Sequence, residues 1–429
     1  MELTWFTELL LPNGELTNLL CKTGEGAGTV LRSGVRVKPT AEEAPYTKTY
    51  RCKGLRAIPP LCDLHAHLYE VGYAYRETLQ TGLAAALAGG YGTVCTVPES
   101  PPHAPFHAQS MVEYIHSATR LHTAGCEILP VASALEADGT LPDYDALLAA
   151  GAAAFSLHAG LPDAARLYEV MCAVAERNAV LFLRPRFAQF TGSAGSQSTA
   201  RHLGLQPLPA SAESAAVAMA VAMAEETGCR VHLSPVTCAQ SLAYIRLAKS
   251  RGKTVSCETA PPYFTFSDAE LLFRGTAVKL EPPLRTQTDR DALRTAIADG
   301  TVDCICSDHT PREDAEKRLS FAEAAAGAVG LETAFAVSYT ELVVRGVLSL
   351  PRLLSMMRDM PLNLLSRPAP APFMPGSPAD FYLLAPNECA VLGAHFQGKA
   401  HNTPFEGLPL FGVPARAVRG GILQSGKPS

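Results

Sequence analysis

The chain has 429 residues and a formal net charge of −5 without a run of like charges, which argues against nucleic acid or an anionic membrane as a partner. Hydrophobic residues make up 47% of the sequence and charged residues 18%, as is typical of a globular protein whose central elements are buried. The N-terminal residues lack a basic segment leading into an apolar one, and no stretch is long enough to span a bilayer. We therefore expect a cytoplasmic protein.

Twelve cysteines are scattered along the chain without a tight repeat. Several lie in or beside apolar, strand-like runs, among them Cys95, Cys229, Cys257, Cys304 and Cys306. Buried reduced thiols explain this placement better than a disulfide framework does. Cys304 and Cys306 could act as metal ligands, but within a buried strand their use as core-filling side chains is favoured.

The first part of the chain, residues 2–57, is typical of short β segments broken by turns and is too small to form a domain alone. From residue 58 onward, short apolar runs alternate with longer amphipathic runs, a pattern that predicts βα units and a parallel sheet. The expected strands are one that runs into His65 and His67, followed by residues 92–97, 127–133, 153–157, 180–183, 230–233, 254–257 and 302–308. The expected helices cover residues 78–87, 109–121, 144–149, 163–177, 212–226, 239–249, 289–298 and 331–344.

Eight such units predict an α/β fold of the (β/α)8, or TIM-barrel, type, in which the active site lies at the carboxyl ends of the strands. Residues 368–378 are rich in proline and are expected to form a linker, after which short β runs return. We therefore expect three segments: residues 1–57, a barrel over residues 58–368, and residues 369–429. The first and last segments are expected to join in one small β-sandwich that flanks the barrel.

His65 and His67 are the first candidates for a functional site. Residues i and i+2 of a strand point to the same face, so the two imidazoles are expected side by side, where they can bind one metal ion. His232 and Asp308 end the predicted sixth and eighth strands, at the same end of the barrel. Taken singly, His232 could be a buried structural residue and Asp308 an ion-pair partner. Together, the four residues form a ligand set suited to zinc, with Asp308 as the group that transfers a proton during amide hydrolysis.

The sequence resembles the dihydroorotase branch of the amidohydrolase superfamily over nearly its whole length. The resemblance rests on separate motifs, which are Asp63-Leu64-His65-Ala66-His67-Leu68, Tyr75-Arg76-Glu77-Thr78, Ala88-Gly89-Gly90-Tyr91-Gly92-Thr93-Val94-Cys95, Pro282-Pro283-Leu284-Arg285, Asp289-Arg290-Asp291-Ala292-Leu293, Asp308-His309-Thr310-Pro311 and Gly330-Leu331-Glu332-Thr333. The resemblance implies a metal-dependent barrel with a flanking β-sandwich that interconverts N-carbamoyl-aspartate and dihydroorotate in pyrimidine synthesis. It also implies that His65, His67 and His232 bind metal and that Asp308 is the general acid/base.

Three substrate-contacting positions differ from the pattern of this family. Tyr69 stands where an arginine typically clamps the substrate carboxylate, and Glu99 and Glu281 stand where asparagines are usual. A tyrosine cannot form a bidentate ion pair, and added carboxylates repel an anion. These changes favour a less anionic cyclic amide or ureide, such as a hydantoin-like ring, as an alternative to dihydroorotate.

The metal-binding positions also differ. The end of the fourth strand offers His158 instead of a bridging carboxylate, and Arg184 or Pro185 replaces a histidine at the end of the fifth. Arg312 stands where many relatives have another histidine. We expect one zinc ion per chain, with Arg184 in the space of a second metal and paired with Asp308 or Glu281. We expect His158 to be a loop or surface histidine. The alternative is that it compensates for the missing ligands by binding the metal.

Two functional interpretations follow. In the first, the chain is a working cyclic amidohydrolase with one metal ion and a small-molecule substrate. In the second, it is a catalytically impaired homologue kept as a structural subunit, for example of aspartate transcarbamoylase. A homo-oligomer is a further possible assembly. Because His65, His67, His232 and Asp308 are all present, we adopt the enzyme interpretation.

Overall fold

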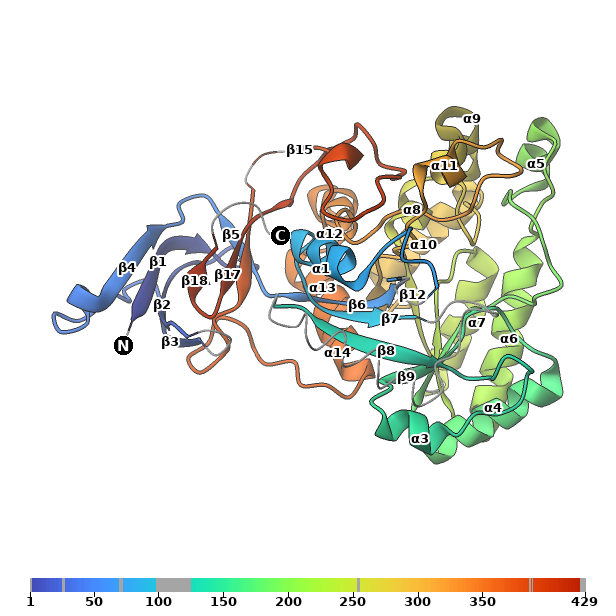
Figure 1. Cartoon of the computed structure of the whole chain (residues 1–429), viewed down its shortest axis with the longest axis horizontal. Coiled ribbons are helices and arrows are strands. Elements are labelled where there is room, and N and C mark those ends of the chain that lie inside the picture. The colour runs from blue at the N-terminus through green and yellow to red at the C-terminus, as the bar shows by residue number, and fades with distance from the viewer. Residues whose placement is uncertain are drawn as a thin grey trace.

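The computed structural model describes residues 2–24, 28–68, 72–97, 125–252, 255–385, 387 and 389–424. The expected helix over residues 109–121 and two candidate substrate contacts, Tyr69 and Glu99, lie outside the described residues. Figure 1 shows a larger α/β part and, beside it, a smaller β part in which the blue N-terminal strands lie next to the red C-terminal strands. No helix in these ranges is both long and apolar enough to cross a membrane.

The larger part is built on eight consecutive parallel strands, each hydrogen-bonded to the next. The sheet is closed by a parallel bridge between Ala66 and His309, and the backbone N–H of His67 donates to the carbonyl oxygen of His309 at 2.8 Å. The (β/α)8 barrel expected from the sequence is therefore confirmed. Its strands are β6 (Leu61–Ala66), β7 (Tyr91–Thr96), β8 (Glu127–Ser133), β9 (Ala154–Leu157), β10 (Val180–Leu183), β11 (Arg230–Leu233), β12 (Val255–Thr259) and β13 (Cys304–Ile305).

Most of the described helices lie close to the expected positions. The Thr78 side chain caps the first helix, and the Thr286 side chain caps the helix before β13. The main helices are α1 (Leu79–Ala88), α3 (Tyr144–Ala149), α4 (Ala164–Glu176), α6 (Ala210–Thr227), α7 (Ala239–Ser250), α10 (Gln287–Asp299) and α12 (Ala334–Ser338), which continues as the π-helical segment η5 (Tyr339–Val344). Figure 1 shows α3, α4, α6 and α7 on the outer side of the barrel strands. Shorter helices are α5 (Gln197–Leu203), α8 (Pro261–Thr265), α9 (Leu271–Arg274), α11 (Asp314–Lys317), α13 (Leu350–Leu354), the π-helical segment η6 (Ser355–Asp359) and α14 (Met360–Leu364).

The eighth strand is shorter than the sequence predicts, because β13 covers only Cys304–Ile305. The backbone N–H of Ser307 donates to the side chain of Asp63 at 2.7 Å instead of to a neighbouring strand. Asp308 then adopts a left-handed backbone conformation, with φ of 50°, which ends regular strand geometry. This turn brings the Asp308 side chain to the carboxyl ends of the strands.

The smaller part is a single hydrogen-bonded sheet that combines strands from both ends of the chain. The short strand β5 (Arg56–Ile58) joins its two halves, since it pairs with β1 (Leu3–Leu10) and with β14 (Phe381–Leu384). The sheet has a hydrophobic core of its own, in which Phe6 contacts Phe381. The other strands are β2 (Leu16–Lys22), β3 (Thr29–Gly34), β4 (Thr47–Arg51), β17 (Pro414–Arg419) and β18 (Ile422–Leu423). A separate two-stranded sheet, β15 (Cys389–Ala390) with β16 (Pro409–Leu410), precedes β17.

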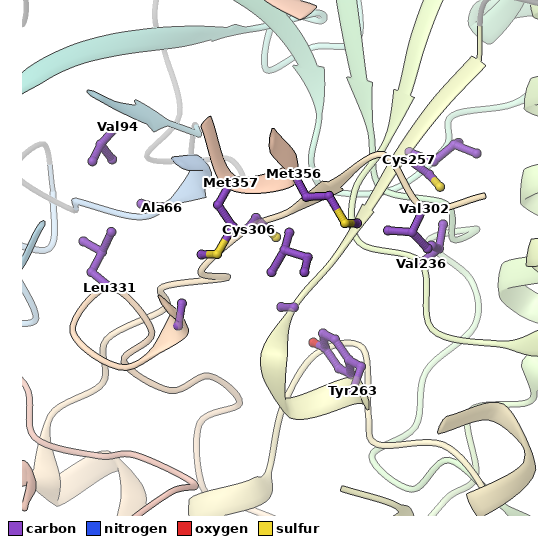
Figure 2. Close-up of a cluster of buried hydrophobic side chains, with 14 of the residues drawn as sticks. Ala66, Val94, Val236, Cys257, Tyr263, Val302, Cys306, Leu331, Met356 and Met357 are labelled. Atoms are coloured by element: carbon purple, nitrogen blue, oxygen red, sulfur yellow. The ribbon is translucent and has the colours of Figure 1, made fainter. Parts of the chain in front are cut away.

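The main hydrophobic core lies between the barrel strands and the surrounding helices. Figure 2 shows a region of it where Met356 and Met357 of η6 join Val94 of β7 and Cys306, which follows β13. A second cluster fills the barrel with residues such as Leu64, Val131 and Phe182. All twelve cysteines are free thiols and ten of them are buried, in agreement with the expected absence of a disulfide framework. The barrel is thus a packed scaffold whose core is mainly apolar.

Candidate active site

Three histidines gather at the carboxyl ends of the barrel strands. His65 and His67 come from the end of β6, and their ring centroids lie 5.6 Å apart, as the spacing predicts. His158, which follows β9, lies 4.7 Å from His67 and 5.4 Å from His65 by the same measure. One ligating atom from each of the three lies within 4.8 Å of the other two. His158 lies in a loop, as expected, and this loop turns it inward toward the pair. Its position therefore favours the alternative expectation, a role as a compensating ligand.

The orientation of His65 is set by two partners on neighbouring strands. Its Nδ1 lies 2.6 Å from Ser234 Oγ, and the Ser234 hydroxyl donates its own hydrogen to Glu258 Oε1. The hydroxyl oxygen must then accept from Nδ1–H, which leaves a lone pair on Nε2. The Nε2 atom is buried, has no hydrogen-bond partner in the described chain, and lies 3.8 Å from Asp308 Oδ1. Such an atom, facing a carboxylate, fits a metal ligand.

The charges around His65 also favour a cation. Burial by itself lowers the pKa of His65, but Glu258 and Asp308 together raise this pKa above its ordinary value. In contrast, burial and the neighbouring charges of His67 and Arg184 hold the pKa of His158 well below its usual range. His158 is therefore neutral near pH 7, the form in which an imidazole binds metal.

Glu258, at the end of β12, is a buried carboxylate that the sequence analysis did not identify. Its Oε1 lies 3.4 Å from His65 Nδ1, and its Oε2 lies 3.4 Å from His232 Nε2. Burial opposes ionisation, yet the neighbouring imidazoles of His232 and His65 hold the pKa of Glu258 well below its ordinary value. The sequence feature that could have identified Glu258 is its position directly after the apolar run of the seventh strand.

His232 is buried on β11, where its Nδ1 lies 2.8 Å from Ser256 Oγ. Because its Nε2 faces Glu258, the structure does not bring His232 into the group formed by His65, His67 and His158. Glu258 thus separates His232 from the other three histidines and contacts His65 on the opposite side.

Cys306 is close enough to His65 and Glu258 to form a second group of candidate ligands. Burial, with the nearby charge of Glu258, raises the pKa of the Cys306 thiol well above its usual value, so the thiol stays protonated. The thiol donates to the carbonyl oxygen of Thr259 at 3.6 Å and belongs to the main hydrophobic core. A core-filling role is thus favoured for Cys306, and Cys304 lies in the cluster that fills the barrel.

Asp308 is held by Tyr263 of α8, whose hydroxyl donates to Asp308 Oδ2 at 2.8 Å. The other carboxylate oxygen, Oδ1, faces His65. Burial raises the pKa of Asp308 above its ordinary value, while His65 and Tyr263 oppose this rise. A carboxylate that is fixed on one oxygen and faces the histidines with the other is suited to proton transfer at this site.

Arg184 and Arg186 follow β10 and take different partners around Glu281. Arg186 forms an ion pair with the Glu281 carboxylate. Arg184 instead donates through one terminal nitrogen to the backbone carbonyl of Glu281, and the other terminal nitrogen lies 3.5 Å from His158 Nε2. Arg184 forms no ion pair within 4.0 Å with the expected carboxylates, since Arg186 pairs with Glu281 and Tyr263 holds Asp308. Its charge nevertheless acts on Glu281, because Arg184, followed by Arg186, lowers the pKa of this carboxyl group.

These groups surround a small cavity of about 110 Å³ at the strand ends. Arg312 also faces it, and its Nε donates to the carbonyl oxygen of Ala326 at 2.7 Å. The cavity thus brings together potential metal ligands, a carboxylate for proton transfer, and guanidinium groups. Its polar lining consists of His67, His158, Arg184, Glu281, Asp308, Thr310 and Arg312.

His309, next to Asp308, has a structural role. Its Nδ1 accepts hydrogen bonds from the backbone N–H groups of Gly330, at 3.1 Å, and Leu331, at 3.4 Å. Its Nε2 lies 3.6 Å from Glu77 Oε2. Since its backbone also closes the barrel onto β6, His309 fixes the seam beside the site.

The chain is similar in sequence and in fold to known proteins. The family described as "Dihydro-orotase-like" matches residues 55–241. The chain is 36% identical to a dihydroorotase of Desulforapulum autotrophicum over 89% of this chain and 90% of that protein, and 34% identical to one of Pelotomaculum thermopropionicum over 92% and 91%. Among solved structures, the L-hydantoinase (dihydropyrimidinase) from Arthrobacter aurescens has the same fold, with a TM-score of 0.85 and 22% identity over 100% of this chain and 97% of that one.

Proposed function

Since this chain belongs to the dihydroorotase family, we propose that it is a metal-dependent hydrolase that opens and closes a cyclic amide C–N bond. The substrate we propose is dihydroorotate, or a closely related cyclic ureide. The observation that carries the proposal is the buried Nε2 of His65, which has no hydrogen-bond partner in the described chain and faces Asp308 beside two further histidines. A buried imidazole nitrogen that faces a carboxylate in this way fits a metal ligand.

We propose one zinc ion, bound by His65, His67 and His158 with Asp308 beside it. Three imidazoles and a carboxylate are ligands that zinc prefers. The guanidinium of Arg184 lies against His158, and its positive charge disfavours a second cation there. His232 supports the site from outside, because it holds Glu258 against His65. His65, His67 and Asp308 were in the predicted ligand set and stay in the proposed one. His158 takes the place of His232.

Bound zinc would polarise the amide carbonyl and lower the pKa of a water molecule. The residues of the chain supply the proton transfers. Asp308 takes a proton from the attacking water as the hydroxyl group adds to the carbonyl carbon. It then gives this proton to the ring nitrogen as the C–N bond breaks. The hydroxyl of Tyr263 holds Asp308 Oδ2, which keeps the other oxygen turned toward the reacting atoms.

The alternative of a catalytically impaired structural subunit is less favoured. A scaffold has no need for a hydrogen-bonded chain from Glu258 through Ser234 to His65, nor for a tyrosine that orients Asp308. Association with a transcarbamoylase or with a second copy stays a prediction. Co-purification and solution mass measurements test it separately from catalysis.

The direct test of the proposed function is a dihydroorotate hydrolysis assay on protein purified without chelator. We expect turnover by the wild type and a loss of about 100-fold or more in kcat in Asp308→Asn, because the proton-transfer group is removed. Asp314→Asn, a substitution at an exposed residue of α11, is the matched control and should retain full activity. Equal activity in Asp308→Asn and the wild type would contradict the assigned role, and no turnover by the wild type of any cyclic amide would contradict the function.

A further inference from the structure

We propose that Asn402 is a positioning residue for the active site, because it fixes one wall of the cavity at the carboxyl ends of the barrel strands. Asn402 lies in the loop of residues 391–408, which joins β15 to β16 in the C-terminal part of the chain. The cavity wall in question is formed by Ala326, Gly327 and Ala328. The inference rests on the proposed function, and it adds to the active site a residue from a loop outside the barrel.

The contacts of Asn402 join two segments that border the cavity. Its side-chain nitrogen donates to the carbonyl oxygen of Gly327 at 3.0 Å, and its side-chain oxygen accepts from the backbone N–H of Arg312 at 3.2 Å. Its backbone carbonyl oxygen accepts from the N–H of Val329 at 2.9 Å. An asparagine amide has both donors and an acceptor, so one side chain can serve a carbonyl and an N–H group at once. Asn402 therefore ties the cavity wall to the segment that follows Asp308.

The cavity wall depends on such side-chain contacts because it has no regular structure. Residues 325–330 belong to neither a helix nor a strand, so their backbone groups need partners elsewhere. Lys317 of α11 donates to the carbonyl oxygen of Gly327 at 2.9 Å. This carbonyl thus accepts from two side chains on different segments, Lys317 and Asn402. Both side chains restrain the same point of the cavity wall.

The loop that carries Asn402 is itself fixed on both sides of this residue. Before Asn402, the backbone N–H of Lys399 donates to the buried carboxylate of Glu77 at 3.2 Å. After Asn402, the ring of Phe405 stacks on the ring of Phe266, with centroids 5.2 Å apart. Because the loop is anchored at both points, Asn402 gives the cavity wall a fixed support.

The metal site and the proton-transfer group have other supports. The proposed zinc ligands lie at the ends of β6 and β9, and the hydroxyl of Tyr263 holds Asp308 at 2.8 Å. Loss of the Asn402 side chain therefore loosens the wall of the substrate cavity, while Asp308 and the zinc ligands keep their partners. A change confined to substrate binding raises KM and leaves kcat almost unaltered.

The test measures the hydrolysis of dihydroorotate and the zinc content of Asn402→Ala. We expect KM to rise about tenfold or more, with kcat within about threefold of the wild type and zinc content unchanged, because only hydrogen bonds to the cavity wall are lost. Asn363→Ala, the same substitution at an exposed asparagine of α14, is the control and should change neither constant. If Asn402 served folding alone, its loss would reduce the fraction of folded enzyme, which lowers the apparent kcat and leaves KM unaltered. That result would overturn the inference.

A second variant reaches the same carbonyl from the other side. Lys317→Met removes the other donor to Gly327 and should also raise KM. Because the two side chains restrain one point, the double variant should raise KM by less than the product of the two single effects. Single effects that multiply in full would overturn the inference that both act through the cavity wall. If the wild type hydrolyses dihydroorotate and Asn402→Ala has the same KM, the inference fails while the proposed function stands. If the wild type hydrolyses no cyclic amide, both fail.

Discussion

His65 Nδ1 lies 3.4 Å from Oε1 of Glu258, a carboxylate without exposed surface whose other oxygen lies 3.4 Å from His232 Nε2. Glu258 therefore links two histidines on different strands and orients the one that faces Asp308. A carboxylate behind a metal-binding imidazole makes the imidazole a stronger ligand and fixes its ring.

Replacing this carboxylate should weaken metal binding. In Glu258→Gln, the neutral amide loses the charge that favours a cation at His65, so we expect zinc affinity to fall about 10- to 100-fold. A competition titration against a chromophoric chelator measures the change. Glu341→Gln, at another buried glutamate, on η5, is the control and should leave zinc affinity unaltered. Unchanged zinc affinity in Glu258→Gln would show that Glu258 has no part in the site.

Tyr263 should affect catalysis without affecting metal content. Its hydroxyl donates to Asp308 Oδ2 at 2.8 Å, and its loss in Tyr263→Phe leaves the carboxylate free to rotate. We expect kcat to fall about tenfold, which corresponds to a hydrogen bond of about 1.4 kcal/mol in the transition state. Steady-state kinetics and metal analysis on the same preparation separate the two effects. A loss of metal that parallels the loss of kcat would argue against a role confined to Asp308.

The seam between the first and eighth strands should depend on Asp63. Its two carboxylate oxygens accept hydrogen bonds from Ser307, at 2.7 Å from the backbone N–H and 2.5 Å from the hydroxyl. In Asp63→Ala the backbone N–H stays buried without a partner, and the hydroxyl keeps only the carbonyl oxygen of His65, at 3.3 Å. We therefore expect the free energy of unfolding to fall by about 3 kcal/mol. Urea unfolding measures this loss. Asp291→Ala, at an exposed aspartate of α10, should change stability by less than about 0.5 kcal/mol.

Lys317 should make the stability of the fold depend on pH. It is buried near the cavity wall, where its ammonium group donates to the carbonyl oxygens of Gly327 and Ala325 at 2.9 and 3.0 Å. Burial, with the neighbouring cations Arg312 and Lys279, lowers the pKa of Lys317 from 10.5 to about 7. Above pH 7 the folded chain releases this proton while the unfolded chain keeps it up to about pH 10, so the unfolded state binds more protons. The contribution of Lys317 to the free energy of unfolding therefore rises with pH between about pH 7 and pH 10.

The variant Lys317→Met isolates this contribution. Between pH 7 and 9 the wild type should gain stability relative to Lys317→Met, at a slope of at most about 1.4 kcal/mol per pH unit. Urea unfolding of both proteins at several pH values within this range measures the difference in their free energies of unfolding. Titratable groups that the two proteins share contribute equally to both and cancel in this difference. Parallel stability curves for the two proteins would mean that Lys317 titrates normally in the folded state.

The barrel could be predicted from the sequence because its strands are short apolar runs and its helices are longer amphipathic ones. The predicted third strand and third helix, for example, match β8 (Glu127–Ser133) and α3 (Tyr144–Ala149). The eighth strand was predicted too long, since nothing in its apolar composition shows that the Ser307 backbone is diverted to Asp63. The neighbouring positions of His65 and His67 followed from strand geometry alone.

The remaining parts of the site depend on the directions in which side chains point, and these directions cannot be read from the sequence. His158 follows its strand in a loop, and whether such a side chain turns inward is decided by tertiary packing. Arg184 and Arg186 flank one proline, so the sequence does not indicate which of them pairs with Glu281. Glu258 was missed because a carboxylate next to an apolar strand acquires meaning only when two histidines from other strands face it.

The metal content of the purified chain tests the central claim most directly. Elemental analysis of protein prepared without chelator should find about one zinc ion per chain in the wild type and in His202→Ala, a control at an exposed histidine of α5. It should find almost none in His65→Ala and a clear reduction in His158→Ala, because both lose a ligand. Wild-type protein that contains no metal, or that binds two ions per chain, would contradict the single-metal hydrolase.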